Sequence, residues 1–547
     1  MGIKFSGSDA GGFRFDFSGA NSAAGGSEGS AAPKRERKPR KAVGTPGKRI
    51  AINSLVTLLV GAVYFYLELP AINLHAEEFY GFVLLLCAVY CGCALLTSGF
   101  QGEGAKGYFR FVKKQCTVPF FLAAGLLALA VVGGVASWVV FRAGSYQKLL
   151  TVQSGDFSSE IAEVAYDRIP MLDKDSAEKL GDRKLGALAN VVSQFVVSES
   201  YTQINYNGKP KKVASLEYDG FFKWIGNRDT GVPGYVMVDA IDNYADYVEL
   251  ENGIKYTESA YFSEDLRRAL RFAYPTKIFG NISFEVDEDG KAFYIVSCMK
   301  PKAGLFGAMD VSEVIMFNPV DGSHSLLSVG EIPSWVDIVY EGNLACRKYD
   351  WKGLYSGGFF NSIIGNKGCK QTTDDFGYIM RDDDVWYFTG VTSITADSSN
   401  IGFILSNART GEYKFYPVIG AEEHSAMGAA EGEVQEKGYI ASFPSLVNVS
   451  GQPSYIMVLK DANGLVKLYA LVNVQQYNMV ATGETQSEAM SAYIKTLRQN
   501  GIAVNDPDID DSDGDKNAED FEIKIADMKY LALSGTTYVY ITAEDGK

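Results

Sequence analysis

The first quarter of the chain contains three long apolar runs without a charged residue, at residues 50–67, 79–97 and 118–141. A helix needs about 20 apolar residues to cross a bilayer core about 30 Å thick. Lipid offers no partner for backbone polar groups, so apolar runs of this length favour helices that span the membrane. The pattern therefore predicts three transmembrane helices within residues 50–141 and a globular remainder.

The remainder is dominated by strand-like segments that end in Asn or Asp. Four segments share the order apolar strand, Asn or Asp, short turn and second strand, with the turns beginning at Asp239, Asn318, Asn407 and Asn473. Asn and Asp side chains cap turns, and Gly supplies positive φ. We therefore expect four β-hairpins, of which the last lacks the Gly.

Two of these hairpins lie in longer units with the same order of elements. Residues 262–330 and 420–498 each contain a helical stretch, a strand, a Gly placed four residues before a Tyr, and the hairpin. The matched pairs are Gly290 with Tyr294 and Gly451 with Tyr455. A helix laid on an antiparallel sheet would bury one face of the strands, so the spacing predicts two related modules.

This order of helix, strand and Asn or Asp hairpin resembles PepSY and cystatin-like modules. With three N-terminal spans in front, the chain is similar to uncharacterised membrane proteins of anaerobic Firmicutes, and the phrases LRRALRFAYP at residues 266–275 and IPSWVD at residues 332–337 are typical of that group. The resemblance covers most of residues 190–500. It implies a membrane-anchored α+β fold with repeated helix-plus-antiparallel-sheet modules and a bacterial cell-envelope setting, and it carries over no catalytic residue.

The composition along the chain divides it into eight expected segments. These are a disordered basic tail (1–49), three transmembrane helices (50–141), a helical membrane-proximal linker (142–192), a first α+β module (193–333), a central β module with an aromatic loop (334–420), a second helix-plus-sheet module (421–504), an acidic linker (505–520) and a terminal β segment that a truncation could have shortened (521–547).

The basic residues of the loops predict the orientation, because Lys and Arg concentrate on the cytoplasmic side. Residues 68–78 contain three Glu and no Lys or Arg, whereas the flanking segments are basic. The basic residues before the first run and before the third are Lys34, Arg35, Arg37, Lys38, Arg40, Lys41, Lys48, Arg49, and Lys106, Arg110, Lys113, Lys114. We expect a cytoplasmic N-terminus that also attracts anionic membrane lipids, and an extracytoplasmic region from residue 142 onward.

The net charge of this expected external region excludes one class of partner. The whole chain carries −15, residues 1–49 carry +6 and residues 50–141 carry 0, so residues 142–547 carry −21. Nucleic-acid binding needs clustered Lys and Arg to neutralise phosphates. Nucleic acid is therefore not an expected partner of the external region.

The sequence contains no pattern typical of a cofactor or a catalytic triad. Its three His, at 75, 324 and 424, lack metal-ligand spacing, and no Gly-rich phosphate loop follows a strand. Asp511, Asp513, Asp515 and Asp520 approximate a calcium loop around Gly514, although Ile509 stands where that loop should open; a solvated acidic linker is the alternative. No cofactor is expected.

Three cysteines, Cys298, Cys346 and Cys369, lie outside the spans. Cys346 and Cys369 flank a Gly-rich aromatic stretch and could close it as a disulfide; reduced thiols are the alternative.

Aromatic residues crowd residues 335–360 among several Gly. Aromatic side chains dominate binding hot spots, so this stretch is the expected partner-binding loop; core packing in a β domain is the alternative. The candidates are Trp335, Trp351, Tyr355, Phe359 and Phe360. Arg267, Arg268 and Arg271 could bind an acidic group or pair with acidic residues on the surface.

These observations favour a membrane-anchored binding or scaffold protein of the cell envelope, without evident catalytic activity, whose partner is an envelope protein or peptide. One alternative is an envelope enzyme or maturation factor that uses a pair of carboxylates, for which a cleft with two carboxyl groups would speak. Another is an accessory subunit of a membrane complex. Transport by this chain alone is not expected, because the spans contain no charged residue of the kind that marks a pathway.

Overall fold

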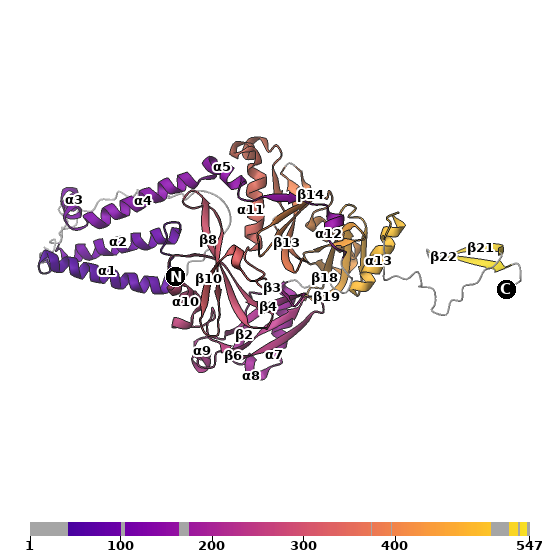
Figure 1. Ribbon diagram of the computed structural model, residues 1–547, viewed down its shortest axis with the longest axis horizontal. Coiled ribbons are helices and arrows are strands. Elements are labelled where there is room, and N and C mark those ends of the chain that lie inside the picture. Colours follow the sequence, from indigo (N-terminus) through magenta and orange to yellow (C-terminus); the bar gives the residue numbers. More distant parts are fainter. Residues whose placement is uncertain are drawn as a thin grey trace, which may run out of the picture.

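The computed structural model describes residues 42–99, 104–163, 174–373, 375–394, 396–504, 525–533 and 536–543. Membrane-type helices lie at one end of the molecule, four β-sheets with their helices form the body, and a hairpin of β21 (Ile525–Leu533) and β22 (Thr536–Ala543) lies at the opposite end (Figure 1). The basic cluster at 34–41 and the acidic segment at 505–520, with its calcium candidates, lie outside the described residues.

Among the described residues, three helices are long and apolar enough to cross a membrane: α1 (Pro46–Glu68), α2 (Glu77–Thr97) and α4 (Thr117–Ser137). α3 (Gly104–Gln115) precedes α4, and α5 (Val139–Gln147) follows it. The third span is shorter than expected, because Trp138 adopts an extended conformation with ψ 135° and separates α4 from α5. The polar Asn53 of α1 is buried and accepts a hydrogen bond from the Thr97 hydroxyl of α2, which explains how a polar residue is accommodated in the first span.

The first half of the body contains two antiparallel sheets around one shared core. One sheet has the order β2-β4-β5-β6, with β3 on β4, and the other has the order β10-β9-β8-β7. The strands are β2 (Phe195–Val197), β3 (Thr202–Tyr206), β4 (Lys209–Tyr218), β5 (Val232–Asp239), β6 (Tyr244–Ile254), β7 (Ile278–Val286), β8 (Ala292–Ala303), β9 (Gly307–Phe317) and β10 (His324–Ser328), and the helices are α7 (Lys174–Gly186), α8 (Ala189–Val192), α9 (Phe221–Asn227) and α10 (Leu266–Ala273).

The second half repeats this use of two sheets around one core. One sheet has the order β1-β15-β14-β13-β11, with β12 on β13, and the other has the order β16-β18-β19-β20, with β17 on β18. The strands are β1 (Val152–Ser154), β11 (Lys370–Thr372), β12 (Gly377–Arg381), β13 (Asp384–Ser393), β14 (Ala396–Asn407), β15 (Tyr413–Tyr416), β16 (Ile440–Ala441), β17 (Ser445–Val449), β18 (Gln452–Lys460), β19 (Val466–Asn473) and β20 (Val480–Gly483), and the helices are α6 (Phe157–Glu160), α11 (Gly342–Leu354), α12 (Glu423–Glu433) and α13 (Gln486–Gln499).

The four expected hairpins are confirmed, and so is the reason given for them. In each turn the Oδ1 atom of the Asn or Asp accepts hydrogen bonds from backbone N–H groups two or three residues later, at 2.8–3.0 Å. The capping residues are Asp239, Asn318, Asn407 and Asn473.

The segment expected as a linker, 142–192, packs against both halves of the body where the structure describes it. β1 pairs in parallel with β15, so Val152 lies opposite Tyr413. Phe157 and Ile161 are buried in the core of the second half, and α7 packs on β5 and β6 of the first half. Short strands and single helical turns depend on tertiary partners far along the chain, which a local pattern does not identify.

Candidate functional site beside the membrane helices

The expected aromatic loop is not an open loop, because α11 occupies half of it. Trp335 packs on Phe293 with 5.1 Å between ring centroids. Trp351 and Tyr355 contact Tyr146 of α5 at 5.1 and 6.2 Å. The five candidates are therefore divided between different neighbours, and the last of them, Phe360, is 69 % exposed beside Phe359.

The expected disulfide between Cys346 and Cys369 is not formed. The thiol of Cys369 instead donates to the Leu354 carbonyl at 3.2 Å. Cys346 lies on α11, whereas Cys369 lies just before β11. The spacing of the two cysteines along the chain did not reveal this helix.

A hollow of about 640 Å³ adjoins the membrane helices. One wall is formed by the end of α1, the start of α2 and their connection, including Glu68, Glu78 and His75, and the other is formed by α10 and β7. Figure 1 shows α10 beside the end of α1, at the edge of the body that faces the membrane helices.

Two of the three arginines of α10 join the body to the first membrane helix. Arg271 is 5 % exposed, and its Nε donates to the Leu69 carbonyl at 2.8 Å while Nη1 donates to the Lys277 backbone carbonyl at 2.5 Å. Nε of Arg268 donates to the Tyr66 carbonyl at 3.2 Å, and its guanidinium lies over the Tyr66 ring. These groups are engaged within the chain and are not available to hold an acidic ligand.

A second contact joins the body to α2 and α4. The tip of the β8–β9 hairpin places Leu305 against Gly133 of α4, and the Ser137 hydroxyl accepts hydrogen bonds from the N–H groups of Leu305 and Phe306 at 2.7 and 3.0 Å. The His75 ring, in the connection before α2, lies 2.8 Å from the Leu305 carbonyl oxygen, and the Tyr80 ring of α2 packs on Phe306 with 5.5 Å between centroids. The body is thus attached to all three membrane helices by hydrogen bonds and packing, and not by the covalent connection alone.

A second cavity, of about 330 Å³, shares Arg267, Gly280 and Ile282 with the first and extends into the first half of the body. Its wall carries Glu217, Glu258 and Glu341, together with the hydroxyl groups of Ser198, Ser200 and Ser215. Arg267 is the basic residue of this wall, and its guanidinium pairs with Glu258 at 3.1 Å. The wall therefore has an excess of carboxylates and of hydrogen-bonding groups.

Glu217 differs from its neighbours in environment. Burial raises the pKa of the Glu217 carboxyl, and hydrogen bonds from Ser259 oppose that rise only in part. The backbone N–H of Ser259 donates to Glu217 at 2.9 Å, and Ser215 donates at 3.3 Å. A carboxyl with a raised pKa beside the Arg-paired Glu258 provides two acidic groups in different electrostatic surroundings.

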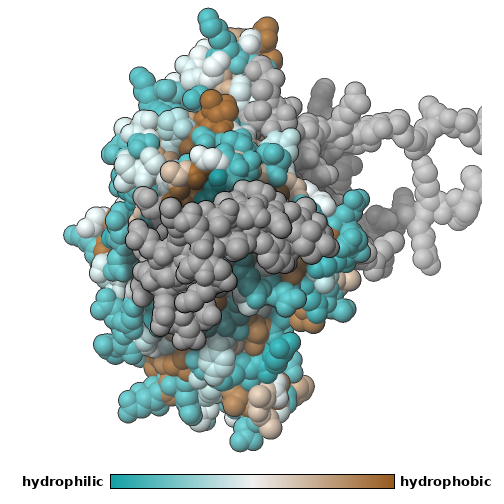
Figure 2. All heavy atoms as spheres, turned by 90° about the vertical axis from the view of Figure 1, so that its right-hand side faces the viewer, coloured by the Kyte–Doolittle hydropathy of each residue, from teal (hydrophilic) through white to brown (hydrophobic). Residues whose placement is uncertain are grey.

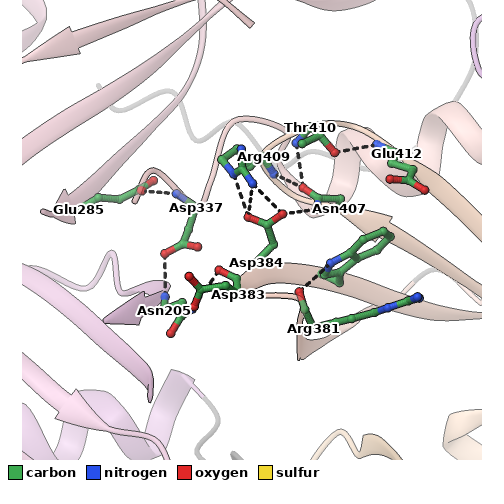
Figure 3. Close-up of polar contacts among 11 residues, drawn as sticks. Asn205, Glu285, Asp337, Arg381, Asp383, Asp384, Asn407, Arg409, Thr410 and Glu412 are labelled. Carbon is green, nitrogen blue, oxygen red and sulfur yellow. Dashed lines mark hydrogen bonds and ion pairs between the residues drawn. The ribbon is translucent and has the colours of Figure 1, made fainter. Parts of the chain in front are cut away.

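A further acidic group lies deep between the two halves (Figure 3). The carboxylate of Glu285 on β7 accepts hydrogen bonds from the N–H groups of Asp337 and Ile338 at 2.7 and 3.1 Å, and Asp337 accepts one from Asn205 on β3 at 2.6 Å. Burial raises the pKa of Asp337 to about 9, and the neighbouring Glu285 contributes to that rise. Glu285 and Asp337 are 0 % and 1 % exposed, so their role is to join elements and not to contact a ligand.

The same junction contains an ion pair of the second half. Arg409 donates to both carboxylate oxygens of Asp384 at 2.8 Å, and Asn407 donates to Asp384 at 2.7 Å (Figure 3). Two N–H groups of one guanidinium on one carboxylate make a strong and directional contact. This pair orders the start of β13, next to the backbone carbonyl of Asp383 that receives Asn205.

The sequence did not predict the two cavities, the contacts between the body and the membrane helices, or the buried junction between the two halves. The LRRALRFAYP phrase did contain a signal, because its apolar positions at 266 and 270 are buried while Arg271 lies on the side that meets α1. Nothing in the local pattern connected Glu217, Glu258 and Glu341, which come from three separate parts of the chain. No group of three or more metal-ligating side chains occurs in the part of the chain that the structure describes.

Comparison with known proteins does not assign the chain. No family model and no curated protein matches it. A solved structure described as a "putative exo-beta-1,3-galactanase" from Bifidobacterium bifidum s17 is similar to 53 % of this chain and 72 % of its own, with 9 % identity and a TM-score of 0.17. A similarity this weak supports no argument about fold or activity.

Proposed function

We propose that the chain is a membrane-anchored, extracytoplasmic binding or scaffold protein of the cell envelope, and that it holds its partner in the cavity lined by Glu217, Glu258 and Glu341. The observation that carries the proposal is the excess of carboxylates and hydroxyl groups in a hollow of about 330 Å³, which adjoins the cavity beside the membrane helices. Charge complementarity favours a partner that presents cationic or hydrogen-donating groups. An envelope protein or peptide with Lys or Arg in an exposed segment fits this chemistry.

The attachment of the body to the membrane helices supports a scaffold role. Arg268 and Arg271 of the body donate hydrogen bonds to carbonyl groups at the end of α1, and Ser137 of α4 accepts one from the Leu305 N–H, so that the cavity would be held at a set distance from the bilayer. A site fixed in this way selects partners that are themselves held near the membrane, because their effective concentration is high there.

The proposed modules of PepSY or cystatin type rest on a shared order: α10 and α12 each precede an antiparallel sheet, with Tyr294 and Tyr455 buried in it.

The partner can be tested by crosslinking from inside the cavity. A photoreactive residue at Asn281, which lines the cavity, should capture an envelope protein from intact cells, whereas the same residue at the exposed Glu436 should not. In the Asn281 background, Glu258→Gln should reduce the capture, because it removes one charge from the wall. Equal capture from positions 281 and 436 would contradict the proposal.

The external location has its own test. A reporter enzyme that is active only in the cytoplasm, fused after Lys547, should be silent, while the same reporter fused before Pro46 should be active. Activity of the C-terminal fusion would place the body inside the cell.

A carboxylate-based enzyme is the second candidate, because Glu217 and Glu258 line the same cavity and the burial of Glu217 raises its pKa. Carboxyl groups in contrasting environments can act as acid and base or nucleophile in glycan hydrolysis. Release of reducing sugar from envelope glycan by the purified protein, lost in Glu217→Gln but not in Glu436→Gln, would support this candidate.

A further inference from the structure

The first half of the body carries an aromatic patch made of Phe221, Phe222, Ile225, Tyr261 and Phe262. Phe222 is 83 % exposed and Phe262 is 56 % exposed, and the other three are exposed to a smaller extent. The rings form one connected group, in which Phe221 contacts Phe222 at 5.8 Å and Tyr261 at 5.0 Å. Contiguous exposed apolar groups are typical of surfaces that bind a protein, a membrane or a ligand.

A short chain of contacts connects the patch to the first membrane helix. Nη1 of Arg268 donates to the Phe262 carbonyl at 2.6 Å, and Nε of the same residue donates to the Tyr66 carbonyl of α1 at 3.2 Å. One side chain therefore spans from the patch to the last turn of α1. Phe272 of α10 lies against the Phe65 and Tyr66 rings of the same helix, at 5.5 and 6.3 Å.

The patch consequently lies at the level where α1 leaves the membrane. Figure 1 agrees, because α9 and α10 both lie at the edge of the body nearest α1. The opposite end of the body is largely hydrophilic, with scattered hydrophobic residues (Figure 2). The aromatic group is thus on the side that faces the bilayer, next to a helix that is itself embedded.

The backbone holds Phe262 outward at a cost in conformational energy. Its φ is +56°, a left-handed conformation that a bulky residue adopts rarely. Its ring packs on the Trp224 ring at 5.6 Å, and the Trp224 indole N–H is held by Glu264 at 2.8 Å. Strained residues persist where the surroundings enforce them, which is frequent at functional surfaces.

The charged neighbours make an apolar occupant more suitable than a strongly anionic one. Arg228 lies over the Trp224 ring at 5.1 Å and pairs with Glu264, while Asp219 and Asp229 flank α9. With both signs present, burial of the rings is the main attraction. Phe and Leu side chains on one face of an interfacial element bury themselves at the boundary between headgroups and acyl chains, where their apolar faces leave water.

From these contacts we propose that the aromatic patch inserts into the interfacial layer of the same membrane that holds α1, and so rests the first half of the body on the lipid surface. This surface is separate from the acidic cavity and does not depend on the partner proposed for it. The occupant is a zwitterionic or neutral lipid surface, not a protein.

The test uses the full chain in nanodiscs of phosphatidylcholine whose acyl chains carry bromine near the headgroup end. In Phe222→Trp, the emission added over wild type should be mostly lost in brominated lipid and retained in the unbrominated lipid. Tyr477→Trp is the matched control, because Tyr477 is an exposed aromatic residue beyond β19, in the second half of the body. Its added emission should be the same in both lipids.

A second measurement protects the result against misfolding of the variant. Hydrogen exchange of α9 in the wild-type protein should be slower in nanodiscs than in a detergent that leaves the body exposed, while exchange of α13 should not change. Unquenched emission at position 222, together with equal exchange of α9 in both media, would overturn the proposal.

Discussion

Nε of Arg271, a residue of the globular body, lies 2.8 Å from the carbonyl oxygen of Leu69, which ends the first membrane helix. Leu69 has a left-handed conformation, with φ 51°, so its carbonyl turns away from the helix axis and toward the body. A buried guanidinium thus replaces water as the hydrogen-bond partner of the backbone carbonyl at the C-terminal end of α1.

Replacement of Arg271 should destabilise this attachment strongly. Arg271→Gln should lower the free energy of unfolding by about 2–4 kcal/mol, because several buried carbonyl groups lose a charged donor. Thermal unfolding of the full chain in nanodiscs measures the change. Arg267→Gln, on the same helix but with a side chain 65 % exposed, is the control and should cost less than about 1 kcal/mol. Equal losses in the two variants would show that the contact at Leu69 has no special weight.

The contact between Gly133 and Leu305 should be intolerant of a single methyl group. A Cβ atom at Gly133 would lie 2.3 Å from Cδ2 of Leu305, whereas one at Gly134 would meet nothing within 4 Å. Gly133→Ala should therefore cost about 1–3 kcal/mol, and Gly134→Ala should be neutral.

The double variant Gly133→Ala/Leu305→Ala separates packing from helix propensity. The double variant should lose less free energy of unfolding than the two single variants lose together, because the clash disappears when Leu305 is shortened. Additive losses would argue that the hairpin tip does not press against α4.

The junction of Glu285 and Asp337 should make stability depend on pH. Burial raises the pKa of Glu285 to about 7 and that of Asp337 to about 9, whereas the same groups titrate near pH 4 in the unfolded chain. The folded state then holds more protons, so the contribution of the pair is complete below about pH 4 and is lost as pH rises toward the folded pKa values.

Denaturant midpoints measured between pH 5 and pH 9 should consequently fall with rising pH in the wild type. Asp337→Asn retains an acceptor for the Asn205 N–H but cannot ionise, so its midpoint should depend less on pH. An unchanged slope in this variant would remove the pair as the cause.

Trp351 should act as a packing residue. Its ring meets Tyr146 edge-on at 5.1 Å, and it lies on α11 against α5. Trp351→Ala should cost about 2–4 kcal/mol, while Phe360→Ala, at a residue 69 % exposed, should change stability by less than about 0.5 kcal/mol. A stable Trp351→Ala variant that fails to capture a partner would restore the binding interpretation of this stretch.

Local patterns determined much of the architecture of this protein. Runs of uncharged apolar residues predict membrane helices because lipid excludes both charge and unpaired backbone, and the structure has three such helices at these places. The turns at Asp239, Asn318, Asn407 and Asn473 followed from side chains that cap their own backbone, an interaction within three residues.

Tertiary structure alone decided which distant groups meet. Glu217, Glu258 and Glu341 form one cavity wall, and Arg271 reaches Leu69 across 202 positions of the chain. The aromatic stretch became the helix α11 because Leu344, Ala345 and Tyr349 are buried in the adjoining cores, which no spacing of rings and glycines indicated. Patterns within a few residues report the local backbone, whereas burial and charge pairing depend on how four sheets and three membrane helices pack together.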